Sequence, residues 1–225
     1  MGPGHSDQGN PREGEMNQFS NYFKFLEVAE DFLKVRNDTK QSEAERIERR
    51  PRPEQFEAVE PPVPPTQWCD NDLFTAGYPA GWFETTPTEP PIEGSSPVLV
   101  LRRDVTGMPD DLGSRGVIRC FRVDRATEVD FLDMAYGLAE VRARSLRATV
   151  VDPERLLSVG GAYCYTFQVQ GMLQIKAFQT VPSGITEVHL FHADQVFMMQ
   201  LESDPQHHDG YRQALGTVLG SLRWK

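Results

Sequence analysis

A run of alternating hydrophobic and polar residues between positions 161 and 203 is the feature that most constrains the fold of this chain. Such alternation places hydrophobic side chains on one face of an extended strand and polar side chains on the other. Gly171, Pro182–Gly184 and Ala193–Gln195 interrupt the alternation, and residues of these types are typical of turns. We therefore predict an antiparallel meander with strands over 161–170, 172–181, 185–192 and 196–203.

Shorter strands and two helices are expected around this meander. Three stretches have the length and composition of strands, and they are 71–79, 96–104 and 116–124. Residues 152–159 have the pattern of a helical turn, and residues 127–146 and 209–224 carry hydrophobic side chains at helical spacing. The expected fold class is α+β, an antiparallel sheet of about six strands flanked by helices.

Hydrophobic residues make up 39% of the chain and are unevenly distributed. Residues 1–16 and 37–67 are polar, charged or proline-rich, and proline-rich segments favour extended conformations that act as spacers. We expect a disordered tail over 1–16, a charged, proline-rich linker over 37–67 and an α+β domain over 68–225. A domain of this size buries about 70% of its unfolded surface, which is enough for a stable core.

Residues 17–36 contain no glycine or proline and predict an amphipathic helix. Five of its residues are aromatic, and burying about 100 Å² of each would contribute on the order of 12 kcal/mol before costs. We expect this helix to dock, either on its own domain or on a partner or second copy. The expected contact residues are Phe19, Tyr22, Phe23, Phe25, Leu26, Phe32 and Leu33.

Charge and cysteine content exclude several classes of protein. The chain has 33 acidic and 23 basic residues, a formal charge of −10, and no basic face of the kind that binds nucleic acid. Three widely spaced cysteines indicate free thiols in a reducing compartment. No run of about 18 hydrophobic residues predicts a membrane span, and the first residues lack a hydrophobic signal core. We expect a cytoplasmic bacterial protein.

Motifs of known catalytic sites are absent from the sequence. There is no GxSxG nucleophile elbow, no GxxxxGK[ST] phosphate loop and no GxGxxG after a strand. Gly160-Gly161 is interpreted as a turn rather than an anion-binding nest. Cys164, on a predicted strand, could form a thiol site with a histidine, which leaves a thiol- or metal-dependent enzyme as an alternative.

The histidines do not predict a metal site. His189 and His192 are three residues apart on a predicted strand, so they point to opposite faces and cannot share an ion. His207 and His208 fall in a stretch that we interpret as an exposed polar loop. We therefore expect no metal and no cofactor.

The stretch FTAGYPAGWF at 74–83 concentrates aromatic residues around a Pro-x-Gly turn. Tyr78, Trp82 and Phe83 are interpreted as a corner of the core, with a ligand groove as the alternative. Met198-Met199 gives the last strand an adaptable hydrophobic surface, which suits a core and also a promiscuous groove.

The order of elements, the Tyr78–Trp82 turn, the strand start at Gly160–Tyr165, the Glu187–Gln200 hairpin and the closing helix resemble the PsbP-like fold over residues 70–225. The similarity is greatest to its bacterial LpqN-like branch. Members are mostly non-enzymatic and include photosystem subunits, mycobacterial lipoproteins and the Eag-type chaperones that hold hydrophobic helices of secreted effectors. The resemblance implies a binding or scaffolding role.

We therefore expect a non-catalytic protein-interaction module, a scaffold or adaptor that docks into a larger assembly or dimer through helix 17–36. One alternative is a secretion-effector chaperone that binds hydrophobic helices in a groove on its sheet. The other is the thiol- or metal-dependent enzyme.

Overall fold

The computed structural model describes residues 52–86, 95–103, 116–123, 138–176, 179–193 and 195–225. The predicted tail at 1–16 and helix at 17–36 lie outside these residues, as does the 37–51 part of the predicted linker.

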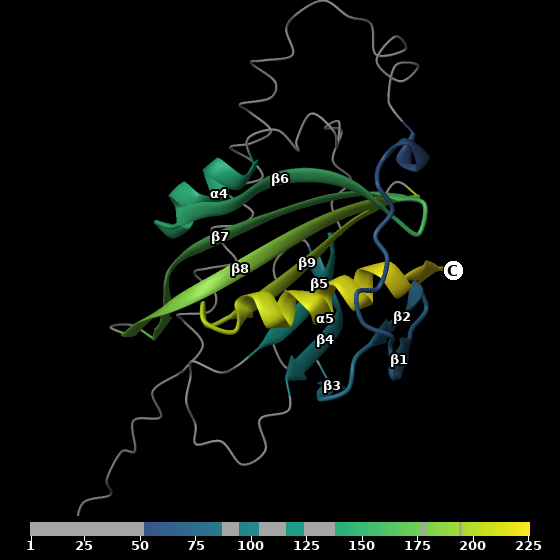
Figure 1. Ribbon diagram of the computed structural model, residues 1–225, viewed down its shortest axis with the longest axis horizontal. Coiled ribbons are helices and arrows are strands. Elements are labelled where there is room, and N and C mark those ends of the chain that lie inside the picture. Colours follow the sequence, from purple (N-terminus) through teal and green to yellow (C-terminus); the bar gives the residue numbers. More distant parts are fainter. Residues whose placement is uncertain (1–51, 87–94, 104–115, 124–137, 177–178, 194) are drawn as a thin grey trace, which may run out of the picture.

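A seven-stranded antiparallel sheet forms the centre of the molecule, in the order β3-β4-β5-β9-β8-β7-β6 (Figure 1). Its strands are β3 (Trp82–Glu84), β4 (Ser95–Arg103), β5 (Val117–Val123), β6 (Thr149–Val159), β7 (Ala162–Lys176), β8 (Gln179–His192) and β9 (Gln195–Ser203). Strands β6 to β9 pair in sequence order as a meander, and β9 then pairs with β5. The predicted α+β fold with an antiparallel sheet is confirmed.

The β7–β8 hairpin differs from the prediction of a turn at Gly171. β7 continues through Gly171, which pairs with Ser183, so the predicted turn at Pro182–Gly184 also lies inside a strand. Gly171 permits a close approach instead, because a Cβ there would lie 2.6 Å from the Cβ of Ala148. Pro182 is tolerated because β8 begins to pair with β9 only at Gly184. The three strands predicted over 161–170, 172–181 and 185–192 are therefore two long strands, β7 and β8.

Strand β6 replaces the helical turn predicted at 152–159. Leu157 and Val159 contact the core at alternate positions, which is the period of a strand. Gly160 and Gly161 join β6 to β7 with φ of +57° and +82°. Positive φ at both positions is characteristic of the type I′ hairpin turn, which favours glycine. The interpretation of this pair as a turn is confirmed.

Helix α5 (His208–Ser221) covers one face of the large sheet. It ends at Ser221, and β10 (Arg223–Trp224) follows where the sequence predicts further helix. β10 pairs with β2 (Phe74–Tyr78), which also pairs with β1 (Gln67–Asp70), forming a second sheet in the order β1-β2-β10. The core between α5 and the strands includes Leu215, Val218, Leu219, Val188, Met199, Leu201, Ile118 and Phe74.

Helix α4 (Leu138–Leu146) lies on the opposite face of the sheet from α5. Neighbouring residues of β8 demonstrate this, since Thr186 contacts α5 while Glu187 contacts α4. α4 confirms the second half of the helix predicted at 127–146, and residues 124–137 lie outside the described ranges. Side chains on the α4 face of the central strands are buried, including Tyr165, Phe167, Ile185 and Met198. Both faces of the central strands are therefore buried at these positions.

Residues 52–66, named here the strap, belong to the folded unit although the sequence assigns them to the linker. The strap begins with the 3₁₀ turn η1 (Pro53–Gln55), and Ala58 forms a parallel bridge with Ser158 at the edge of β6. The N–H of Val59 donates to the carbonyl of Ser158 at 2.9 Å. The folded unit therefore begins at or before residue 52, and not at 68.

The proline-rich end of the strap lies against α5. A Cβ on Gly220 would lie 2.3 Å from the nitrogen of Pro61, and one on Gly216 would lie 3.1 Å from Pro62 Cγ. The hydroxyl of Thr217, between these glycines, donates to the carbonyl of Val63 at 3.1 Å. The two glycines thus leave room for an extended segment that lacks most of its backbone donors.

Candidate functional site

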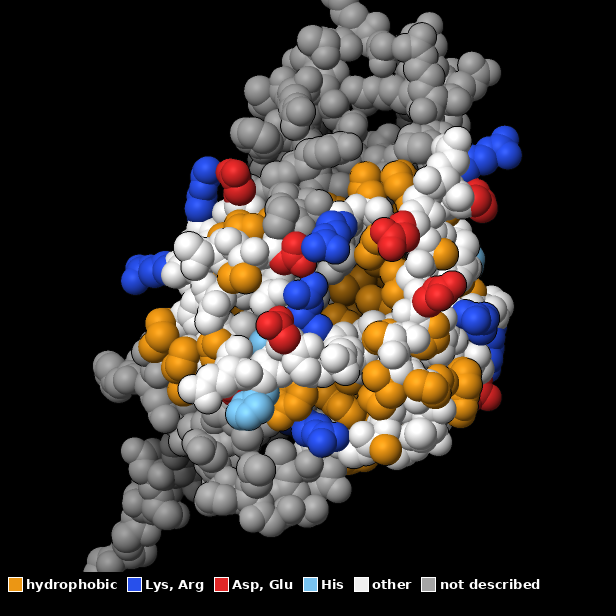
Figure 2. All heavy atoms as spheres, viewed as in Figure 1, with side chains coloured by type: hydrophobic (Ala, Val, Ile, Leu, Met, Phe, Trp, Pro, Cys, Tyr) orange, Lys and Arg blue, Asp and Glu red, His pale blue; other side chains and the backbone are white. Residues whose placement is uncertain are grey.

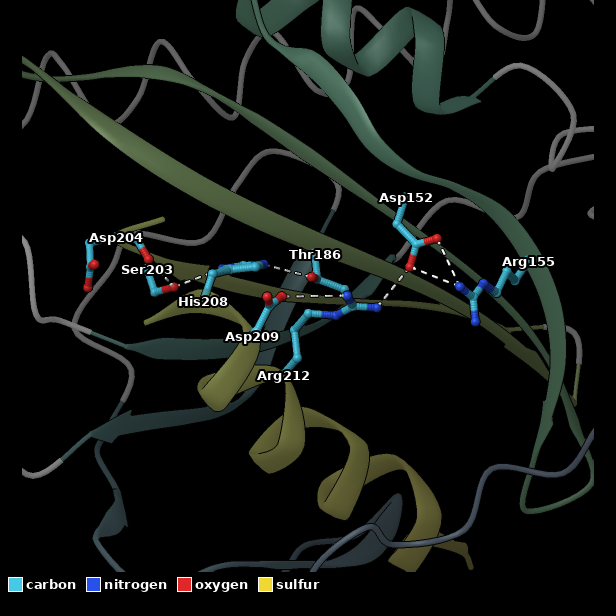
Figure 3. Close-up of polar contacts among 8 residues, drawn as sticks. All are labelled: Asp152, Arg155, Thr186, Ser203, Asp204, His208, Asp209 and Arg212. Atoms are coloured by element: carbon cyan, nitrogen blue, oxygen red, sulfur yellow. Dashed lines mark hydrogen bonds and ion pairs between the residues drawn. The ribbon is translucent and has the colours of Figure 1, made fainter. Parts of the chain in front are cut away.

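The N-terminus of α5 carries a buried histidine in a polar cluster (Figure 3). His208 is only 1% exposed, with Nδ1 2.8 Å from Ser203 Oγ and Nε2 2.9 Å from Thr186 Oγ1. Gly184 makes room for the ring, because a Cβ there would lie 2.7 Å from it. The prediction of an exposed loop is wrong for His208, whereas His207 is exposed beside Asp204.

The geometry of this cluster assigns the protons. Ser203 Oγ donates to the carbonyl of Asp204 at 3.2 Å, so it accepts a hydrogen bond from His208 Nδ1. Nε2 then accepts from the Thr186 hydroxyl. Burial, helped by the nearby Arg212, lowers the pKa of His208 to about 4, so the imidazole is neutral at pH 7. The cluster joins β8, β9 and α5 through the buried ring of His208.

An ion-pair chain beside this histidine connects β6 to α5 (Figure 3). Asp152 lies 3.0 Å from the guanidinium of Arg155 and 3.0 Å from that of Arg212. Arg212 also lies 3.8 Å from Asp209. Because Arg155 and Asp209 are exposed, the pairs that they form with Asp152 and Arg212 each contribute at most about 1 kcal/mol. The chain of charges fixes the N-terminal half of α5 over the edge strand.

A second buried polar cluster fastens α4 to the sheet. Arg142 Nε donates to Glu187 Oε1, and Gln200 Nε2 lies 3.5 Å from the same oxygen. His189 Nε2 lies 3.5 Å from Glu187 Oε2. Burial alone would raise the pKa of Glu187, but Arg142 and His189 outweigh it and lower the pKa, so the carboxylate stays ionised. This is a buried, paired charge that holds a helix in register.

The cysteines lie in the core and do not form a reactive site. Cys164 and Cys120 are fully buried, and burial raises the pKa of both thiols. A protonated thiol without access to solvent is a poor nucleophile, so the thiol-enzyme alternative loses its residue. His189 and His192 point to opposite faces as predicted, since His189 lies on the α4 side and His192 stacks on Trp224 at 4.5 Å. In the described ranges no three His, Cys, Asp or Glu side chains are grouped to hold a metal ion.

The aromatic corner at 74–83 contributes to the core. Tyr78 and Trp82 are buried, and Trp82 packs edge-on against Tyr211 of α5 with ring centroids 5.7 Å apart. Gly116 fits between these rings, because a Cβ there would lie 2.9 Å from Trp82 and 2.8 Å from Tyr211. Phe83 points outward from β3 and is exposed. Tyr78 and Trp82 therefore belong to the core, as interpreted from the sequence, whereas Phe83 points away from them, and the three residues do not share the surface that the alternative, a ligand groove, requires.

A surface groove of about 490 Å³ lies where the strap, the β6–β7 turn and the end of α5 meet. It is lined by residues 58–61, Ser158, the Gly160-Gly161 turn, Gly220 and Arg223. The Arg223 guanidinium donates to the carbonyl of Leu222 at 2.7 Å. Figure 2 shows a hollow with a hydrophobic floor beside α5, with charged side chains of both signs around it.

Two features of the interior were missed by the sequence analysis. His208 and its partners Ser203 and Thr186 come from three elements, so no local spacing connects them. The sequence could have predicted a buried ion pair at Glu187. An acidic residue flanked by Thr186 and Val188 in a hydrophobic strand needs a buried partner for its charge. The predicted docking residues from Phe19 to Leu33 lie outside the described residues.

The described chain is an antiparallel α+β domain whose polar clusters join its layers. No family model matches the sequence, and no curated protein matches it. Solved structures similar to it include cyanobacterial PsbP from Synechocystis sp. PCC 6803, with 12% identity over 72% of this chain and 94% of that chain and a TM-score of 0.48.

LpqN of Mycobacterium tuberculosis, described as involved in cell envelope biogenesis, is similar at 10% identity over 83% of this chain and 99% of that chain, with a TM-score of 0.45. A Pseudomonas aeruginosa protein of unknown function, PA94, matches at 11% identity over 68% and 94% of the two chains, with a TM-score of 0.41. The PsbP-like fold and the LpqN likeness expected from the sequence are thus found again among solved structures. At these identities and TM-scores the likeness concerns the fold alone. No helix in the described part of the chain is long and hydrophobic enough to cross a membrane.

Proposed function

We propose that this protein is a non-catalytic interaction module that associates with a partner or a second copy through helix 17–36. The observation that carries the proposal is the strap, which fixes the N-terminal segment to the domain at β6 and along α5. The linker between the predicted helix and the strap therefore consists of residues 37–51, which is fifteen residues. A flexible chain of that length spans about 20 Å, so the helix is presented close to the domain.

The five aromatic side chains of 17–36 supply the driving force. Left in water, their combined surface would approach the few hundred Å² that monomers tolerate as a single hydrophobic patch. The buried polar clusters of the domain support a non-catalytic role, because the side chains of His208 and Glu187 form contacts that join helices to strands.

A truncation at the strap boundary tests the proposal. Removing residues 1–51 leaves every described strap contact in place, so the domain should keep its unfolding midpoint. Association of the full chain, measured by light scattering with size exclusion, should be lost in this truncation and in the double variant Phe23→Asp/Phe32→Asp. Lys24→Glu, on the polar stripe of the same helix, is the matched control and should associate normally. Association that survives in the truncated protein would refute the proposal.

A further inference from the structure

Strand β1 forms an edge of the small sheet, with β2 on one side of it. The register places Trp68 opposite Gly77, whose N–H donates to Ser221 Oγ at 2.8 Å and whose carbonyl oxygen lies 3.0 Å from the same hydroxyl. The backbone groups of Gly77 therefore point away from β1. Such a pair is a non-hydrogen-bonded pair of the antiparallel ladder, so the N–H and C=O of Trp68 point to the outer edge of the sheet.

The turn after β1 confirms this alternation. The N–H of Asn71 donates to the carbonyl of Phe74 at 3.2 Å, so Asn71 and, two residues earlier, Cys69 direct their backbone groups toward β2. Asp70 lies between them and directs its backbone groups outward, as Trp68 does. Among the described strands none pairs with this side of β1. The edge therefore presents two backbone donors and two backbone acceptors.

The side chains along this edge are accessible as well. Trp68 is 58% exposed, more than any other large exposed hydrophobic residue of the described ranges, and the side chain of Asp70 is 68% exposed. Every residue from 52 to 86 is described, so the chain on both sides of β1 is accounted for. Figure 1 shows β1 and β2 at the rim of the molecule, near the C-terminal end.

The edge at β6 shows how this protein protects a strand that is not meant to accept another. β6 bridges to the strap at Ser158, its ladder with β7 shifts twice, and it carries the exposed Arg155. A covering segment, bulges and charged side chains all hinder the addition of a further strand. β1 has a regular ladder with β2, contains no proline or basic residue, and exposes Trp68.

The charges around β1 determine which kind of strand fits. Asp70, Asp72 and Glu84 are exposed. Burial raises the pKa of the Cys69 thiol, and the negative charges of Glu84 and Asp70 raise it further, so both acids act on this strand. Lys225, 2.7 Å from Asp70, offsets one of the charges. A second copy of β1 would bring the same acids, and a four-residue strand is too short to bury the roughly 1,200 Å² of a stable dimer.

We propose that β1 is a strand-addition site for an extended, basic segment of a partner protein, which pairs with it in the antiparallel direction. The segment carries a lysine or arginine two residues before a hydrophobic residue. Antiparallel pairing then places the hydrophobic side chain opposite Trp68 and the basic one opposite Asp70. Backbone hydrogen bonds provide the affinity and the two side-chain pairs provide the specificity. This surface is separate from helix 17–36 and adds a second interaction to the proposed function.

Titration of the isotope-labelled full chain with the peptide Ac-TKTFTT-NH2, followed by NMR, tests this inference. We expect the amides of Trp68 and Asp70 and the indole of Trp68 to shift. The peptide Ac-TTFTKT-NH2 has the same composition with the lysine after the phenylalanine, and it should bind about two- to fivefold more weakly. N-methylation of the phenylalanine amide in the first peptide should abolish binding, because this N–H donates to the carbonyl of Trp68.

Variants of the protein provide the controls. Asp70→Asn should remove the difference between the two peptides, and Trp68→Thr should weaken both. Phe83→Thr, at the exposed aromatic residue of β3, should bind as the unmodified chain does. Equal binding of the two peptides, binding that survives N-methylation, or shifts confined to other strands would overturn the inference. Shifts of the same amides that grow with protein concentration in the absence of peptide would overturn it too, because they would assign this edge to a second copy.

Discussion

Three glycines on α5 allow the contact between strap and helix to be tested quantitatively. Gly210 has open space around its Cβ position, whereas a Cβ on Gly216 would lie 3.1 Å from Pro62 Cγ. A Cβ on Gly220 would lie 2.3 Å from the Pro61 nitrogen and 2.5 Å from the Glu60 carbonyl carbon. All three glycines lie in the same helix, so substitution by alanine brings a gain in helix propensity of at most about 0.5–1 kcal/mol, the value for a helix interior.

The expected free energies of unfolding therefore separate the three variants. Gly210→Ala should stabilise the protein by the propensity gain alone, because its Cβ meets nothing. Gly216→Ala should be near neutral, because the Pro62 ring can shift by a few tenths of an ångström. Gly220→Ala must push strap backbone outward by about 1 Å, and overpacking of this kind costs about 1–3 kcal/mol. Urea unfolding followed by circular dichroism provides the measurement. If Gly220→Ala proves as stable as Gly210→Ala, the strap does not lie on α5 and the reasoning fails.

Three further predictions concern the buried polar groups and thiols. Lowering the pH from 7 to 5 should reduce the free energy of unfolding by about 2 kcal/mol through His208 alone. The reason is that the unfolded histidine takes up a proton near pH 6.5 and the folded one only near pH 4. In urea titrations, His208→Asn should make the free energy of unfolding less dependent on pH over this range. Arg142→Met should cost about 3–5 kcal/mol by leaving Glu187 buried without its cation, whereas Arg142→Met/Glu187→Met should recover most of the loss in thermal unfolding. Cys120 and Cys164 should resist a thiol reagent in the native protein and react in urea, and rapid native labelling would contradict their burial.

The sequence predicted the elements whose signal is local. The period-two pattern of 161–203 identified the strands of the meander, and the Gly160-Gly161 pair identified a turn. The structure shows that this turn has positive φ at both glycines and closes a hairpin between β6 and β7, not a connection from a helical turn. Prediction from the sequence failed where a residue's role depends on a distant neighbour. Gly171 looks like a turn until Ala148 is known to lie against it, and Pro182 looks like a strand breaker until the overhang of β8 is known.

The strap and the interior clusters were missed for the same physical reason. Prolines at 61–65 favour an extended spacer in isolation, and only Gly216 and Gly220, about 150 residues later, turn that spacer into a packed element. His208 follows a polar stretch, and its burial depends on partners from β8 and β9. Local propensity carries no information about such contacts.

The hydrogen bonds between Ser221 and Gly77 join residues 144 positions apart, whereas β6 to β9 are connected by short turns. Closing so long a loop costs more chain entropy than zipping adjacent hairpins, so we expect the hairpins to assemble early and the joining of α5 to β2 to come last. A substitution that removes the Ser221–Gly77 hydrogen bonds should therefore speed unfolding more than it slows refolding. In the cell, such a variant would still fold, but the folded protein would have a shorter lifetime.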